Sequence, residues 1–125
     1  LVNTASIYGM NDVTHLGIYD IPLISNIPNM VYLAPTNKQE YFAMLDWSIE
    51  QDQYPVAIRI PCNGVISTTE DVDTDYSDLN KYQIKISGSN IAILALGDFF
   101  DIGETLAKAD RRYADTDQSE IYHRT

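Results

Sequence analysis

The chain has 125 residues, enough for one domain or parts of two, and carries a formal net charge of −10. This excess of acidic side chains repels phosphate backbones and anionic membrane surfaces, and no apolar run reaches the ~20 residues that cross a bilayer. We therefore expect neither nucleic acid nor a membrane among its partners. A single cysteine, Cys62, excludes an internal disulfide framework and favours a cytoplasmic location. Because the chain opens at Leu1 without an initiator Met or a targeting segment, we expect the interior of a longer protein.

Strand and helix patterns alternate in the first half of the chain. Residues 1–4 favour a strand, and residues 20–26 favour a helix. Residues 29–35 form a short apolar run closed by a proline, which is typical of a strand buried on both faces. Residues 55–61 lie between two prolines and predict a second buried strand, with Arg59 as its one charge.

A helix is expected between these two strands. Thr36 and Gln39 have the spacing of a capping box, so the helix should begin there and end near residues 51–52. Its apolar positions have helical spacing. They are Tyr41, Met44, Leu45 and Ser48, flanked by Phe42 and Ile49. A strand, helix and strand of this length predict a parallel sheet with a right-handed crossover.

An acidic segment follows, over residues 62–80, without a basic side chain between Asn63 and Asn80 and without a sustained apolar period. We expect a linker or solvated loop there. Residues 82–86 and 91–96 then predict two strands of a second α/β domain. Asp98 or Asp101 could cap the next helix. The expected buried face of this helix consists of Ile102, Thr105, Leu106 and Ala109.

The last stretch, residues 110–125, is mostly polar and offers no strand to continue the second sheet. We expect it not to be a native continuation of the domain, which would leave Ile93, Leu94 and Leu96 exposed unless a partner chain or the first domain covers them. The predicted organisation therefore has four parts: an α/β domain over residues 1–61, an acidic linker over 62–80, the start of a second α/β domain over 81–109, and a polar tail.

Two side chains are candidates for chemistry. His15 lies in a polar, glycine-flanked stretch between a strand and a helix, where ligands of parallel sheets bind, and it could polarise a carbonyl or move a proton. The alternative is a loop histidine bonded to nearby backbone. Arg59 could bind a phosphate or carboxylate with its planar fork. Its alternative is a structural pair with a carboxylate such as Asp12 or Asp20.

Three motifs carry a family resemblance. Residues 11–20 (NDVTHLGIYD), 27–35 (IPNMVYLAP) and 55–61 (PVAIRIP) follow one another in this order. They resemble the D-x-x-T-H-x-G-x-F-D, I-P-N-M-x-x-x-A-P and P-x-A-x-R-x-P motifs of the pyrimidine-binding domain of 1-deoxy-D-xylulose-5-phosphate synthases. Residues 82–109 resemble the start of the C-terminal domain of the same enzymes.

The resemblance implies a transferase of isoprenoid and thiamine biosynthesis. With thiamine diphosphate and Mg²⁺, such an enzyme decarboxylates pyruvate and joins the two-carbon unit to glyceraldehyde 3-phosphate. His15 matches the family's active-site histidine, and Arg59 matches an arginine that binds the acceptor's phosphate. The resemblance further implies a cytoplasmic homodimer whose cofactor and metal ligands lie outside this chain. We therefore expect the 125 residues alone to be inactive.

The sequence also departs from the family pattern. Asn11, a position expected to contact substrate, stands where the family usually has Asp, and Thr4 stands where it has Arg. The loss of a carboxylate and of an arginine weakens contacts to hydroxyl and phosphate groups. The sequence therefore does not determine which acceptor substrate the enzyme uses. A transketolase-like enzyme with another acceptor and a non-catalytic acidic α/β binding module are the alternatives.

Overall fold

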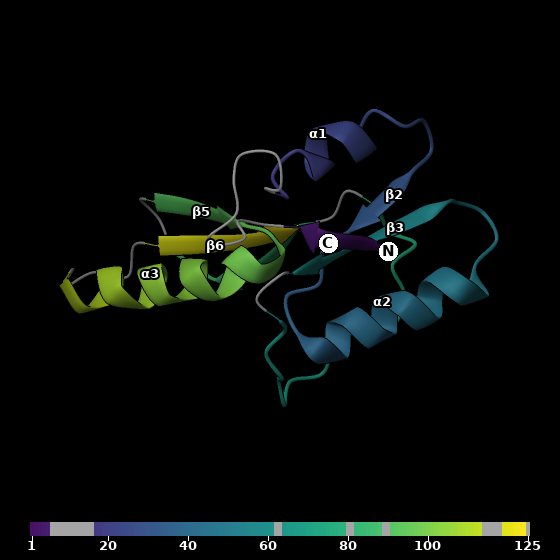
Figure 1. The fold of residues 1–125 in the computed structure, drawn as a ribbon. Coiled ribbons are helices and arrows are strands. Elements are labelled where there is room, and N and C mark those ends of the chain that lie inside the picture. Colours follow the sequence, from purple (N-terminus) through teal and green to yellow (C-terminus); the bar gives the residue numbers. More distant parts are fainter. Residues whose placement is uncertain (6–16, 62–63, 80–81, 89–90, 114–118, 125) are drawn as a thin grey trace.

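The computed structural model describes residues 1–5, 17–61, 64–79, 82–88, 91–113 and 119–124. Their strands form two three-stranded sheets, β1-β3-β2 and β4-β6-β5 (Figure 1). The α/β class predicted from the sequence is confirmed. The limits of the four predicted parts stay a prediction, because separate sheets alone do not define domain boundaries.

The first sheet contains the predicted strand, helix and strand. In chain order these are β2 (Val31–Leu33), α2 (Lys38–Glu50) and β3 (Val56–Pro61), and β2 pairs with β3 in parallel. β1 (Val2–Ala5) pairs with the other edge of β3, also in parallel. The short helix α1 (Asp20–Ile24) lies on the opposite side of this sheet from α2 (Figure 1).

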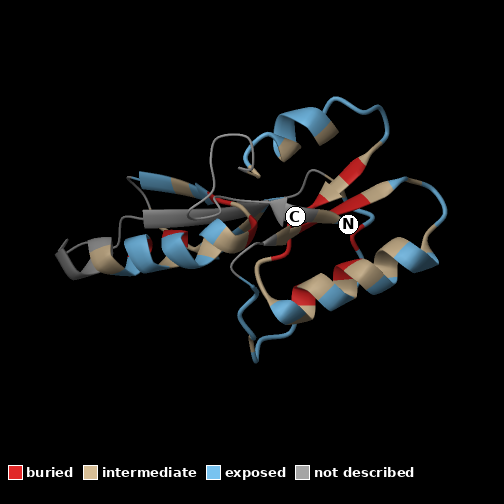
Figure 2. Ribbon diagram, in the orientation of Figure 1, coloured by how far each residue is buried: buried red, intermediate tan, exposed pale blue. Residues whose placement is uncertain are grey.

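The core of this unit lies between α2 and the sheet. Met44 on α2 is fully buried, and it packs against Val31, Leu33 and Ile58 of the two strands. Figure 2 shows the buried positions gathered on the strands and on the facing side of α2. Tyr41, Met44 and Leu45 of the predicted stripe therefore pack as their spacing predicts, whereas the flanking Phe42 and Ile49 are 49% and 73% exposed.

The start of α2 differs from the prediction. Its N-cap is Asn37, whose side chain accepts a hydrogen bond from the Glu40 backbone N–H at 2.8 Å. The Glu40 carboxylate accepts from both the backbone N–H and the hydroxyl of Thr36, at 2.7 and 2.8 Å. The helix is thus capped one residue later than expected, and the Glu40 side chain reaches back to Thr36, the residue before the cap, with charge-assisted hydrogen bonds. Gln39 instead accepts from the Thr68 backbone at 3.0 Å.

The second sheet corrects the prediction for the end of the chain. β4 (Tyr82–Ile86) and β5 (Ile91–Ala95) lie where expected, but β6 (Ser119–Arg124) is the central strand, antiparallel to β4 and parallel to β5. The tail therefore does continue the sheet. Its strand is only six residues long and holds only Ile121 and Tyr122 between polar residues, so composition alone hid it.

The helix of the second unit also buries a different face from the one predicted. After the short 3₁₀ helix η1 (Gly97–Phe99), α3 spans Phe100–Tyr113, beyond the predicted end at residue 109. Gly103 and Ala107 face the sheet, whereas Ile102 and Leu106 are 60% and 57% exposed. The helix lies too close to β5 for large side chains, since a Cβ at Gly103 would be 3.0 Å from that of Ala95.

Exposure on β5 agrees with the prediction at one position of three. Leu94 is 71% exposed, whereas Ile93 and Leu96 are half-buried. Ile93 packs beside the small cluster of Ala95 and Ala107 under α3, so this helix covers one face of the sheet. Within the described residues, no helix has the length and apolar character needed to cross a membrane.

The acidic segment is extended over the first unit rather than free in solvent. Residues 64–79 contain neither helix nor strand, as expected, but Tyr76 is buried and its ring meets Trp47 of α2 edge to face. The Lys38 backbone N–H donates to the carbonyl of Ile66 at 2.8 Å. One buried aromatic side chain therefore anchors a segment whose other residues are mostly exposed.

Candidate functional site

Two of the three predicted site residues, Asn11 and His15, lie outside the described residues, as does Cys62. Their roles stay predictions. The third, Arg59, is near the end of β3 and is only 6% exposed. It is the residue around which the described part of the candidate site is built.

Arg59 is held mainly by Asp20, the first residue of α1. Its Nε donates to Asp20 Oδ2 at 2.6 Å, and its Nη2 donates to Asp20 Oδ1 at 3.3 Å and to the Gly17 carbonyl at 3.2 Å. The two side chains are 7% and 9% exposed, so this is a buried ion pair of the fork-to-fork kind. Asp20, one of the two carboxylates that the sequence suggested as structural partners of Arg59, is therefore its partner in the structure.

Tyr32 of β2 adds a third group to this pair, because its hydroxyl donates to Asp20 Oδ2. Burial alone would raise the pKa of Asp20, but the hydrogen bonds from Arg59 and Tyr32 outweigh burial and hold the pKa below its usual value. Burial and the Asp20 carboxylate both raise the pKa of Tyr32. At neutral pH the cluster therefore contains a carboxylate, a guanidinium and a neutral phenol.

A fourth group comes from the second unit. Asp98, in η1, places its Oδ1 4.0 Å from Arg59 Nη1. That distance exceeds hydrogen-bond length, so Asp98 neutralises charge without bonding the guanidinium. Among the described residues, Asp20 and Gly17 accept hydrogen bonds from Nε and Nη2 of the Arg59 guanidinium, and neither accepts one from Nη1.

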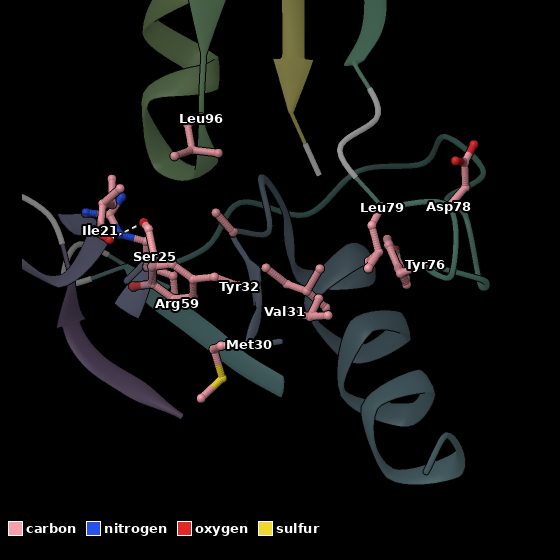
Figure 3. A pocket seen from close by; sticks show the side chains of 12 residues that line it. Ile21, Ser25, Met30, Val31, Tyr32, Arg59, Tyr76, Asp78, Leu79 and Leu96 are labelled. Atoms are coloured by element: carbon pink, nitrogen blue, oxygen red, sulfur yellow. Dashed lines mark hydrogen bonds between the residues drawn. The ribbon is translucent and has the colours of Figure 1, made fainter. Parts of the chain in front are cut away.

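A cavity of about 280 Å³ lies beside this cluster. Figure 3 shows Arg59 and Tyr32 at one side of it, with Tyr76 and Leu79 of the acidic segment at the other. Leu96, which follows β5, closes it from the second unit. The cavity therefore has a mixed polar and apolar lining, which includes Asp78 and one basic residue already paired with a carboxylate. Over the described part of the chain, no three His, Cys, Asp or Glu side chains gather as a metal site.

The fold defines a class of protein. No family model matches the sequence. Among solved structures, the chain is similar to "Split gene transketolase, inactive beta4 tetramer", with a TM-score of 0.69 and 22% identity over 88% of this chain and 35% of that one. At this identity the likeness establishes the fold alone, which is transketolase-like α/β.

The particular family follows from curated relatives, each described as 1-deoxy-D-xylulose-5-phosphate synthase. The chain is 34% identical over 98 residues to that of Clostridium acetobutylicum, covering 77% of this chain and 15% of the relative. It is 31% identical over 103 residues to that of Brevibacillus brevis (82% and 16%), and 35% identical over 96 residues to that of Polaromonas naphthalenivorans (77% and 15%). The chain is therefore a relative of the 1-deoxy-D-xylulose-5-phosphate synthases, as its motifs predict, and spans about 15% of their length.

Sequence reasoning missed two members of the Arg59 cluster. The sequence predicts Tyr32 only as part of a buried strand and Asp98 only as a candidate helix cap. The one available signal for Asp98 is its place three residues beyond the end of a strand, at the edge where parallel sheets bind ligands. Its approach to Arg59 joins two units that are separate in sequence, so local periodicity could not predict it.

Proposed function

We propose that the complete protein carrying these 125 residues is a thiamine diphosphate-dependent transferase that converts pyruvate and glyceraldehyde 3-phosphate into 1-deoxy-D-xylulose 5-phosphate. The observation that carries this proposal is the alignment of 77% to 82% of the chain with synthases named for that product. The three ordered motifs, which contain His15 and Arg59, support it. A non-catalytic binding module is not favoured, because several relatives with one enzymatic name align over the same stretch.

In this proposal the chain supplies substrate-side groups. His15 polarises the substrate carbonyl or moves a proton, and Asn11 contacts a substrate hydroxyl. Arg59 binds the acceptor's phosphate through Nη1, since Asp20 occupies the other edge of its fork. Asp20 and Tyr32 act as positioning residues, because they fix the direction of the guanidinium.

The residues described here do not fit thiamine diphosphate. A diphosphate needs several cations or a metal ion, whereas Arg59 is the one basic residue that lines the described cavity, and the described residues hold no metal-ligand cluster. From the resemblance alone, we propose that the ligands of thiamine diphosphate and Mg²⁺ lie outside this chain. A homodimer and a cytoplasmic location complete the proposal and rest on the resemblance alone.

A second candidate is a transketolase-like enzyme with another acceptor. Asn11 in place of the family's usual Asp favours it, because a neutral amide holds a hydroxyl less strongly than a carboxylate does. The test is to incubate the complete protein with pyruvate, thiamine diphosphate and Mg²⁺, and to compare glyceraldehyde 3-phosphate with unphosphorylated glyceraldehyde as acceptor. Formation of 1-deoxy-D-xylulose 5-phosphate supports the proposal. A product formed with glyceraldehyde but not with glyceraldehyde 3-phosphate supports the second candidate. Absence of a product with either acceptor contradicts both candidates.

A further inference from the structure

Asp98 stands beside the edge of Arg59 that the proposed function assigns to the acceptor. Its Oδ1 lies 4.0 Å from Nη1, and the two side chains are 16% and 7% exposed. A phosphate on Nη1 would therefore meet a cluster of one guanidinium and two carboxylates, partly withdrawn from solvent. Like charges at such a distance and burial repel far more than they do in water.

The position of Asp98 is set by the backbone that precedes it. Gly97 adopts φ +57, and a Cβ there would lie 3.5 Å from the Ala34 Cβ and 3.7 Å from the Pro35 carbonyl oxygen. A left-handed φ favours glycine. Gly97 thus allows the turn after β5 to pack against the end of β2, which brings Asp98 to Arg59.

We propose that Asp98 is a specificity-determining residue that competes with anionic acceptors for Arg59. The inference rests on the proposed function, in which Nη1 is the acceptor-binding nitrogen. While Asp98 stays in place, Arg59 is electrostatically satisfied and binds phosphate weakly. An acceptor that is bound must either displace Asp98 or carry less negative charge.

The experiment compares variants of the complete protein by calorimetric titration with inorganic phosphate, in parallel with acceptor kinetics. Asp98→Asn keeps the shape and removes the charge, and Asp98→Glu keeps the charge. Asp101→Asn is the matched control, because it removes an exposed carboxylate three residues away. Arg59→Lys keeps a cation for Asp20 but loses the fork, and so tests the proposed role of Nη1 independently.

Asp98→Asn is expected to strengthen phosphate binding and to lower the KM for glyceraldehyde 3-phosphate about fivefold, with the KM for pyruvate changed less than about twofold. Asp98→Glu and Asp101→Asn should resemble the unsubstituted protein. If Asp98→Asn and Asp101→Asn act equally, or Asp98→Asn changes only the unfolding midpoint, the inference is overturned.

The Arg59→Lys and Asp98→Asn variants distinguish a failure of this inference from a failure of the proposed function. Weaker phosphate binding in Arg59→Lys, with no gain in Asp98→Asn, keeps the role of Arg59 and rejects that of Asp98. No effect of Arg59→Lys rejects both. Should Asp98→Asn fail to fold, Asp98→Ser replaces it, with the same expected gain in phosphate binding.

Discussion

The buried pair of Asp20 and Arg59 predicts a large loss of stability when its negative member is neutralised. In Asp20→Asn the amide oxygen can still accept from Arg59 Nε, but the amide nitrogen then faces Nη2, another donor, and the charge is gone. Removing one partner of a buried ion pair costs about 3–5 kcal/mol. Because the amide oxygen still accepts from both Arg59 Nε and the Tyr32 hydroxyl, and Asp98 remains nearby, we expect a loss of about 3 kcal/mol, at the lower end of this range.

Urea unfolding of the 125-residue chain measures this loss. Trp47, the chain's one tryptophan, packs on Tyr76 in the first core and reports unfolding of that unit by fluorescence. Asp98→Asn is the matched control and should change the unfolding free energy by less than about 1 kcal/mol, since no hydrogen bond joins Asp98 to Arg59. An effect of Asp20→Asn below about 1 kcal/mol would refute the view that this pair holds α1 to the first sheet.

The same pair predicts a pH dependence. The pKa of Asp20 is lower in the folded state than its ordinary value of 3.8, so its contribution is complete above that value. The contribution is lost as the pH falls through the folded pKa. The unsubstituted chain should therefore lose stability below about pH 4 more steeply than Asp20→Asn does. Parallel profiles of the two chains would contradict the assignment.

Two further predictions concern α2. Met44→Ala should lower the unfolding free energy by about 2–5 kcal/mol, because Met44 is fully buried, whereas Ile49→Ala at an exposed position should change it by less than about 0.5 kcal/mol; equal effects in urea unfolding would contradict the packing described. Asn37→Ala should cost about 1 kcal/mol through loss of the N-cap, and Thr36→Val should cost less, since it removes only one of two bonds to Glu40. If Thr36→Val lowers the unfolding free energy more than Asn37→Ala does, Thr36 rather than Asn37 is the effective N-cap.

The elements with strong local signals were predictable, and those defined by partners distant in sequence were not. The apolar runs ending at Pro35 and Pro61 predicted β2 and β3, because burial on both faces requires continuous apolar sequence. β6 holds only Ile121 and Tyr122 between polar residues, and its role depends on pairing with β4 and β5 on either side. The apolar side chains of α3 predicted the wrong face, because a close approach to β5 selects Gly103 and Ala107 instead.

The candidate site divides in the same way. Arg59 was identified as the lone charge in an apolar strand, and Asp20 was among its expected carboxylate partners. Tyr32 reaches the pair through Asp20 from a neighbouring strand, and Asp98 approaches Arg59 from the second unit. These contacts depend on how elements distant in sequence pack together, which local pattern does not encode. His15 and Asn11 rest on the motif match alone.

The central claim is that this chain supplies the substrate-side histidine of a carboligating transferase. The most direct measurement is kcat/KM for 1-deoxy-D-xylulose 5-phosphate formation by the complete protein carrying His15→Ala, beside a control at the chain's other histidine, His123→Ala. We predict a loss of at least about 100-fold for His15→Ala, as general acid–base and polarising groups contribute, and less than about twofold for the control. A folded His15→Ala protein within about twofold of the unsubstituted activity would contradict the claim.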